Sequence, residues 1–248
     1  MSAVGAAETV GHGDSYYGID DRAATLMRIA NFPDDVLSLL QLEVLVAVNA
    51  LQCYRCDAIV ELGCYDGRSI ELSRSLDLRY LGVDLDPQAI ESLRNRIAAE
   101  GMEARAEAVV ANALDLDQWA GRMQGQRSLI HLPFNFLGSF RTPATLLQRL
   151  CCVPRSLLFI SVFNTSDYTT HVRHRYYTAC GVGALTVSHS ARDMVTFTGD
   201  RHFFSRAFTT DMLHDLFNEC GIDTLLQKSN RLGTCVVAKP RDTSYGCR

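Results

Sequence analysis

Ala58-Ile59-Val60-Glu61-Leu62-Gly63-Cys64-Tyr65-Asp66-Gly67 is the stretch of sequence that decides the fold. It is an apolar run that ends in an acid and continues into a loop with two glycines four residues apart. A second apolar run, Tyr80-Leu81-Gly82-Val83, ends at Asp84. Short apolar runs bounded by turn residues predict buried strands. Two acids at the carboxyl ends of neighbouring strands, with a glycine turn between them, are typical of an open α/β sheet that binds a nucleoside.

Predicted strands and helices alternate along the chain on both sides of this stretch. Such a succession predicts a parallel sheet with right-handed crossovers. The last two strands are separated by only a few residues and must form an antiparallel hairpin. We therefore expect an α/β fold with a Rossmann-like, seven-stranded, mostly parallel sheet, an antiparallel last strand, and helices on both faces. The predicted strands are residues 58–62, 79–84, 104–110, 128–132, 156–163, 223–228 and 233–238, and the helices between them are residues 68–76, 87–100, 115–121, 142–151 and 209–219.

Two further segments are expected to elaborate this sheet. Residues 1–50 form an N-terminal helical cap, or lid, with helices near 22–29 and 34–48. Residues 51–240 form the main domain, and residues 241–248 are a tail. Within the main domain, residues 164–208 interrupt the alternation and are expected to form an insertion after the fifth strand. An insertion of this length is expected to be functional.

Composition limits the class of protein. Lys and Arg number 24 and Asp and Glu 28, a formal charge of −4, which argues against a general nucleic-acid binder. We find no signal peptide and no apolar run of about 20 residues, so no membrane association is expected. An odd count of nine cysteines without framework spacing indicates reduced thiols, and we expect a cytoplasmic protein. Cys53-x-x-Cys56 is interpreted as helix packing.

With its order of elements and the motif Glu61-Leu62-Gly63-x-x-x-Gly67, the chain resembles the class I S-adenosylmethionine-dependent methyltransferases over roughly residues 35 to 240. The resemblance implies S-adenosylmethionine as cofactor. It implies that Glu61 fixes the amino group of the cofactor and that Asp84 accepts hydrogen bonds from both ribose hydroxyls. Asn112 and Ala113 would bind the adenine. A nicotinamide fold is disfavoured because its G-x-G-x-x-G fingerprint fails at the second glycine of residues 63–68.

The loop after the first strand differs in sequence from that of many class I methyltransferases, which carry more glycines there. Gly63 and Gly67 would let the backbone approach the cofactor. Cys64, Tyr65 and Asp66 stand between them, so that Tyr65 is expected to cover the ligand and Asp66 is a second candidate for its amino group. The remaining predicted cofactor contacts are Tyr17, Cys64, Leu85, Leu132 and Pro133.

The acceptor is expected beyond the fourth strand, at His131-Leu132-Pro133-Phe134-Asn135. An Asn-Pro-Pro-Tyr tetrad is absent, which favours a small-molecule acceptor over nucleic acid or protein. Asn135 would orient the acceptor, and His131 is expected to be buried. His202 is the preferred histidine for a general base or a substrate contact. His171 and His174 lack a matching acid, so no metal site is predicted.

The insertion holds five arginines against three aspartates between residues 167 and 206, which suggests a pocket for an anionic group. Aromatic walls suit a sulfonium or an amine, and Tyr16 and Tyr17 would form a lid opposite Tyr176 and Tyr177. The catalytic candidates are thus His202, Asn135 and Tyr17. The predicted substrate contacts are Tyr16, Asn135, Asn164, Arg173, Tyr176, Tyr177 and His202.

These observations predict a biosynthetic enzyme that transfers a methyl group to a small molecule. The leading acceptor is an amine nitrogen of an amino-acid-like or acid-bearing metabolite. O-methylation of a carboxylate or hydroxyl is the close alternative. Methylation of tRNA or protein, and a relative that binds S-adenosylmethionine without methyl transfer, stay open. The apolar second helix is compatible with a homodimer.

Overall fold

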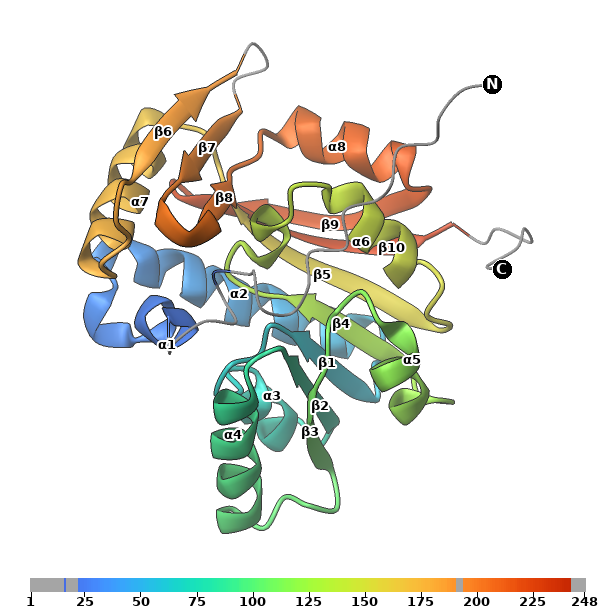
Figure 1. The fold of residues 1–248 in the computed structure, drawn as a ribbon. Coiled ribbons are helices and arrows are strands. Elements are labelled where there is room, and N and C mark those ends of the chain that lie inside the picture. Colours follow the sequence, from blue (N-terminus) through green and yellow to red (C-terminus); the bar gives the residue numbers. More distant parts are fainter. Residues whose placement is uncertain (1–15, 17–21, 191–193, 242–248) are drawn as a thin grey trace, which may run out of the picture.

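A seven-stranded sheet with the order β3-β2-β1-β4-β5-β10-β9 forms the centre of the molecule (Figure 1). The computed structural model describes Tyr16 and residues 22–190 and 194–241. β10 lies between β5 and β9 and runs antiparallel to both, whereas β1 to β5 pair in parallel. The predicted mostly parallel sheet with an antiparallel last strand is confirmed. The strands are β1 (Ala58–Leu62), β2 (Arg79–Asp84), β3 (Ala106–Val110), β4 (Ser128–Leu132), β5 (Ser156–Phe163), β9 (Ile222–Ser229) and β10 (Gly233–Pro240).

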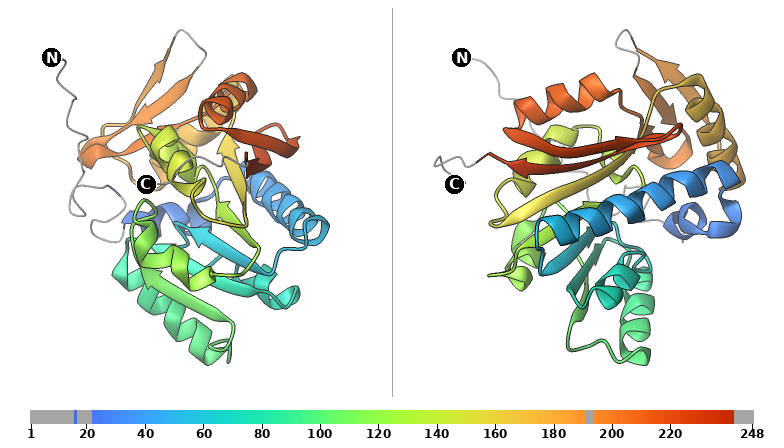
Figure 2. Two further views of the ribbon diagram at one scale, coloured as in Figure 1. Left: turned by 90° about the vertical axis from the view of Figure 1, so that its right-hand side faces the viewer. Right: turned by 180° about the vertical axis from the view of Figure 1, so that it is seen from behind.

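Helices cover both faces of this sheet. Successive residues of a strand point to opposite faces, and Ile59 and Val60 of β1 accordingly belong to two different cores. The first core lies under α2 (Asp34–Cys53), α3 (Ile70–Ser75) and α4 (Pro87–Ala99). The second lies under α5 (Leu116–Trp119), α6 (Pro143–Leu150) and α8 (Thr210–Glu219). Figure 2 shows α2 crossing the sheet in the view from behind.

The helix α2 is longer and more apolar than we expected from the sequence. With 20 residues and a mean hydropathy of 1.7, it is long and apolar enough to cross a membrane by length and composition alone. Its inner face, including Val36, Leu39 and Val46, is buried in the core against the sheet. This packing is that of a core helix. The statement that no apolar run approaches 20 residues was wrong for α2.

The insertion after β5 consists of α7 (Asp167–Ala179) and a second, three-stranded sheet of β6 (Thr186–His189), β7 (Val195–Thr198) and β8 (Phe204–Arg206). The sequence analysis missed β8, which is only three residues long. The insertion lies beside α1 (Arg22–Met27) (Figure 1). The Tyr176 hydroxyl of α7 donates to the Leu26 carbonyl of α1, and the Tyr168 hydroxyl donates to the Asp35 carboxylate of α2. The cap and the insertion therefore contact each other directly.

Short 3-10 turns complete the chain: η2 (Ile29–Asn31), η3 (Ala120–Met123), η4 (Phe136–Ser139) and η5 (Asp200–His202). Within the described part of the chain, seven cysteines are free thiols.

Candidate active site

Glu61 is fully buried at the carboxyl end of β1. Its Oε2 atom accepts hydrogen bonds from the Ser69 amide (3.0 Å) and the Tyr80 hydroxyl (2.7 Å). Its Oε1 atom is buried without a hydrogen-bond partner. Burial raises the pKa of Glu61 to about 7, against the opposing hydrogen bonds and the nearby Arg68 charge. A buried acceptor without a partner is rare, and here it is one that a cationic group would satisfy.

Asp84 ends the neighbouring strand β2, which pairs in parallel with β1. Its Oδ2 atom accepts from the Tyr65 amide (2.8 Å), and its Oδ1 atom accepts from the Asp86 amide (3.0 Å). Burial raises the pKa of this carboxyl. Each oxygen still has acceptor capacity, so the carboxylate could also receive two hydroxyl groups. Leu85, the next residue, is half-buried.

The β1–α3 loop needs glycine at two positions. Gly63 and Gly67 have φ of +67° and +79°, which L-residues rarely adopt. A Cβ atom at Gly63 would lie 2.5 Å from two atoms of the Phe136 ring, and one at Gly67 would lie 2.6 Å from Leu93. Protein side chains therefore pack against both glycines in this structure. Cys64 between them is buried, and burial raises its pKa well above the usual range.

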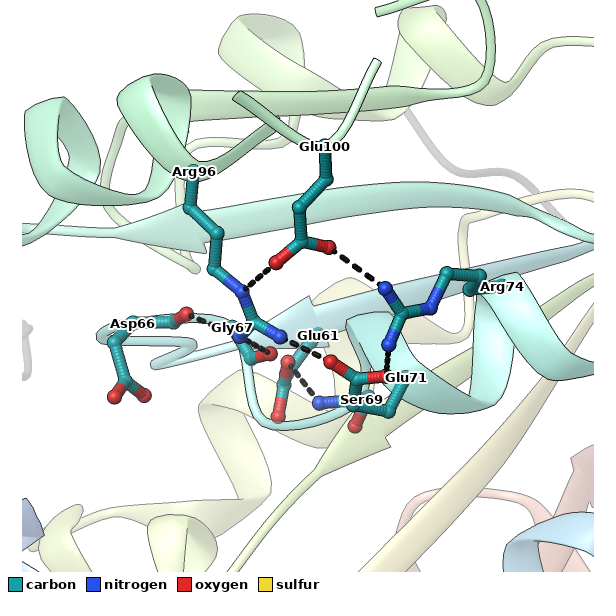
Figure 3. A network of polar contacts seen from close by, with 8 residues as sticks. All are labelled: Glu61, Asp66, Gly67, Ser69, Glu71, Arg74, Arg96 and Glu100. Atoms are coloured by element: carbon teal, nitrogen blue, oxygen red, sulfur yellow. Dashed lines mark hydrogen bonds and ion pairs between the residues drawn. The ribbon is translucent and has the colours of Figure 1, made fainter. Parts of the chain in front are cut away.

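Arginine side chains hold this loop from outside (Figure 3). Arg96 of α4 donates to the carbonyl groups of Asp66 and Gly67, both at 3.5 Å, and pairs with Glu71 and Glu100. Arg74 pairs with the same two acids. The Asp66 carboxylate points away from this network and is exposed. Exposed ion pairs contribute little to stability, but this network ties α3 and α4 to the loop.

The turn after β3, where the adenine contacts are predicted, is ordered by Asn112. Its Oδ1 atom accepts a hydrogen bond from the Leu114 amide at 2.9 Å. The Ala111 amide donates to the Asp84 carbonyl, which joins this turn to the end of β2. Ala113 is buried. The structure thus brings Asn112 and Ala113 next to the strand that carries Asp84.

The segment after β4 is strained. Phe134 and Asn135 have positive φ, at +42° and +64°, and such strain is often stored at functional sites. Leu132 and Pro133, just before them, are buried. The Phe134 amide donates to Glu43 Oε1 of α2 at 2.7 Å, and the Phe163 amide of β5 donates to Asn135 Oδ1 at 3.1 Å. Two buried side chains therefore hold the strained backbone in place.

Glu43 also binds the loop after Gly67. Its Oε2 atom lies 3.0 Å from Arg68 Nη2, and its side chain is 3% exposed, so this is a nearly buried ion pair. One carboxylate of α2 thereby contacts both the β1–α3 loop and the segment after β4. The sequence analysis missed Glu43, although it is the one charged residue in the apolar run of residues 36–53.

Ser205 of β8 is the centre of a second polar cluster. Its Oγ atom lies 3.0 Å from Asn135 Nδ2, 3.0 Å from Arg173 Nη2 and 2.7 Å from the Tyr177 hydroxyl. The structure therefore brings together Asn135, Arg173 and Tyr177, three of the predicted substrate residues. Ser205 itself was missed, because nothing in the sequence marks a serine in an unpredicted strand. Both polar groups of the Asn135 side chain bond to protein, an arrangement that favours a positioning role over the predicted catalytic one.

Aromatic rings line the ends of β4 and β5. The Phe134 ring lies 5.3–5.6 Å from the rings of Phe32, Phe163 and Tyr176. Tyr16 is 3% exposed, and its ring meets that of Phe203 edge-on at 4.9 Å. Tyr16 of the cap thus packs against the insertion, next to the Tyr177–Phe203 pair. Tyr17 lies outside the described residues.

Other predicted site residues lie apart from these clusters. His202 is exposed in η5, with φ of +66°. Asn164 precedes Ser166, the N-cap of α7; its Oδ1 atom accepts from the Ser166 amide and the Thr169 hydroxyl, and its Nδ2 atom donates to the Arg231 carbonyl. These contacts favour a structural role for Asn164. Two charges counted in the insertion, those of residues 192 and 193, lie outside the described residues.

His131 is buried in β4, as expected. Its Nδ1 atom lies 2.8 Å from Ser69 Oγ, and its ring stacks on Phe159 with the centroids 4.6 Å apart. Burial, with a contribution from the Arg68 charge, lowers its pKa to about 3. It is therefore a neutral core histidine. Within the described part of the chain, no group of three or more His, Cys, Asp and Glu residues could hold a metal ion.

Several solved structures share this architecture. An S-adenosylmethionine-dependent methyltransferase from Methanosarcina mazei is 20% identical, over 75% of this chain and 92% of that protein, with a TM-score of 0.53. The 1,6-didemethyltoxoflavin-N1-methyltransferase of Burkholderia thailandensis, solved with 1,6-didemethyltoxoflavin and S-adenosylhomocysteine, is 18% identical over 79% and 76% (TM-score 0.54). The CcbJ methyltransferase of Streptomyces caelestis is 14% identical over 74% and 88% (TM-score 0.54).

Comparison with protein-family models and with curated protein sequences gives no match. At the identities above, the structural likeness shows the fold: this chain has the architecture of S-adenosylmethionine-dependent methyltransferases. The residues present also fit that cofactor. Glu61 offers a buried oxygen without a partner, and Asp84 offers a carboxylate at the next strand end.

Proposed function

We propose that this protein is an S-adenosylmethionine-dependent methyltransferase that acts on a small molecule. The observation that carries the proposal is the pair of acids, the buried Glu61 and the half-buried Asp84, at the carboxyl ends of two adjacent parallel strands with the Gly63 turn between them. Ligands of open α/β sheets bind at this edge. The fold shared with methyltransferases supports the same reading.

Each residue would have a separate task. Glu61 Oε1 would bind the amino group of the cofactor, and Asp84 would bind the two ribose hydroxyls. Asn112 and Ala113 would contact the adenine. When bound, the cofactor supplies an electrophilic methyl group on a sulfonium. The protein's part is to align the acceptor and exclude water, for which the rings of Phe134, Tyr176 and Tyr177 are suitable walls.

The acceptor we propose is an amine nitrogen of an amino-acid-like or acid-bearing metabolite. Aromatic rings around the ends of β4 and β5 favour cationic groups. The Burkholderia relative in fold is an N1-methyltransferase of a small molecule.

Calorimetric titration tests the cofactor assignment. We expect micromolar binding of S-adenosylmethionine and S-adenosylhomocysteine and no binding of NAD. Absence of binding by both sulfur compounds would overturn the proposal. Incubation with methyl-labelled donor and pools of small amines then tests transfer. Binding of the donor without labelled product in any pool would favour a relative that binds S-adenosylmethionine but does not methylate.

A further inference from the structure

Arg173, in the middle of α7, is fully buried and has no acidic partner among the described residues. Its Nη2 atom donates to the Ser205 carbonyl (2.8 Å) and to Ser205 Oγ (3.0 Å). Its Nε atom makes a long contact of 3.4 Å to the Tyr177 hydroxyl. The guanidinium is thus fixed in position by neutral groups alone.

The Nη1 atom of Arg173 is buried and has no hydrogen-bond partner. A guanidinium carries five N–H donors, and a buried charge without a counter-charge is costly. The rings of Phe163, Tyr177 and Phe197 lie 5.3, 5.7 and 4.6 Å from its central carbon. Cation–π attraction offsets part of this cost, but it leaves both Nη1 donors unsatisfied. A bound anion would satisfy them.

The position of Arg173 relates this anion to the candidate active site. Ser205 connects Arg173 to Asn135, which follows β4, and Phe163 ends β5. The guanidinium therefore lies at the edge of the sheet where the strands present their carboxyl ends. In this fold type that edge holds the ligands.

We propose that Arg173 Nη1 binds a carboxylate group of the methyl acceptor. This inference rests on the proposed function and specifies its substrate class as a monocarboxylic acid. The groups around Arg173 are neutral, since Asn135, Tyr177 and Ser205 carry no charge. A monoanion balances the single cation, whereas a phosphate dianion would leave one negative charge buried.

Two neighbouring arginines of the insertion, Arg175 and Arg206, do not supply that second charge. Arg175 is 51% exposed and lies 3.6 Å from Asp35. Arg206 follows Ser205 in β8 and therefore points to the opposite face of that strand, where its guanidinium lies over the Phe204 ring. Neither guanidinium shares the cluster around Ser205, and the carboxylate is the better match.

Calorimetry with protein saturated with S-adenosylhomocysteine tests this proposal without any need for turnover. The probes are glycine and 2-aminobenzoate, each beside its carboxamide. We expect at least one acid to bind the wild-type protein ten times more tightly than its amide. Arg173→Met should abolish this preference, while Arg173→Lys, which keeps the charge but loses the planar donors, should reduce it.

Arg175→Met is the matched control, because it removes a neighbouring arginine of the same helix, and it should leave the preference unchanged. If Arg173→Met does not fold, Arg173→Lys decides. If the role of Arg173 is purely structural, Arg173→Lys should have a lower melting temperature, but the folded variant should prefer the acid over the amide as strongly as wild type. That result would overturn the proposal. Lack of any acid preference in the wild-type protein also overturns it. Failure of S-adenosylhomocysteine to bind, with acid preference intact, would instead count against the proposed function.

Discussion

At the scale of single residues, Asp84 is the firmest assignment of the candidate site. A carboxylate that receives two hydroxyls of a buried ribose contributes hydrogen bonds to a charged group, each of about 1.5–3 kcal/mol. We predict that Asp84→Ala weakens S-adenosylmethionine binding by about 2–3 kcal/mol. Calorimetric titration measures this change. Asp66→Ala, at an exposed carboxylate of the same region, should have a much smaller effect. Unchanged affinity in Asp84→Ala would refute the ribose assignment.

We predict that Glu61 makes the affinity for the cofactor depend on pH. Its pKa is raised to about 7 by burial, so below pH 7 the carboxyl is mostly protonated in the ligand-free protein. In the proposed function the ammonium of the cofactor would bind the ionised form, and affinity should therefore rise with pH, by about tenfold between pH 5.5 and 7. His131 does not interfere, since its pKa of about 3 keeps it neutral in this range.

Glu61→Gln is the control for this pH dependence. The amide oxygen can still accept from Ser69 and Tyr80, but it does not titrate. We expect weaker binding that is flat between pH 5.5 and 7. A slope in Glu61→Gln equal to that of wild type would assign the titration to another group.

At the scale of elements, the sequence predicted the main sheet well because most of its strands are short apolar runs that end at turn residues. Glu61 and Asp84 could be located because each ends such a strand. The contacts within the insertion could not be predicted. β8 has only three residues, too few to show the alternation of apolar and polar residues that predicts a strand. The Ser205 cluster joins residues up to 70 positions apart in the sequence. Asn164 and Asn135 have polar side chains at the expected strand ends, but the sequence could not show that these side chains bond to the protein's own backbone.

Comparing Gly63 of the β1–α3 loop with Gly101, which follows α4, separates the conformational cost of a glycine-to-alanine substitution from its steric cost. Gly101 and Gly63 have nearly equal φ, +64° and +67°, but a Cβ at Gly101 meets nothing within 4 Å, whereas one at Gly63 meets the Phe136 ring. We predict that Gly101→Ala costs about 1 kcal/mol of unfolding free energy, the conformational part alone. Gly63→Ala should cost about 1–3 kcal/mol more, because the ring must move. Urea denaturation measures both, and equal losses would show that Phe136 yields freely.

Glu43 lets α2 hold both loops of the site. Removing one partner of a buried ion pair costs about 3–5 kcal/mol, and Glu43→Ala would also leave the Phe134 amide without its acceptor. Since Arg68 is 25% exposed, we predict a loss at the low end, about 3 kcal/mol, in urea denaturation. Glu43→Gln keeps an acceptor for Phe134 and should lose less. Equal losses in the two variants would mean that the charge, and not the hydrogen bond, dominates.

At the scale of the whole molecule, cap and insertion act as one unit over the sheet. Tyr176 joins α7 to α1, and Tyr168 and Arg175 join it to Asp35 of α2. The helix α2 is in turn bound through Glu43 to the loops that carry the candidate cofactor and acceptor residues. In the proposed function, positioning of the acceptor would therefore depend on α2, a helix outside the predicted binding motif. One face of α2 is involved in this packing, and the other is exposed.

That outer face predicts a homodimer. Leu37, Val44 and Leu45 are 40%, 49% and 69% exposed, and their spacing of seven and eight residues places them on one stripe. Val44 and Leu45 lie midway between Asp34 and Arg55, both exposed. A two-fold axis at this point would bring each acid opposite the partner's arginine, as an isologous contact requires. We predict that the wild-type protein sediments as a dimer and that Leu45→Glu sediments as a monomer. Leu225→Glu, at a 40% exposed leucine of β9, should stay dimeric. A wild-type protein that sediments as a monomer at tens of micromolar would refute the dimer. The apolar stripe of α2 would then be a candidate contact surface for a different protein.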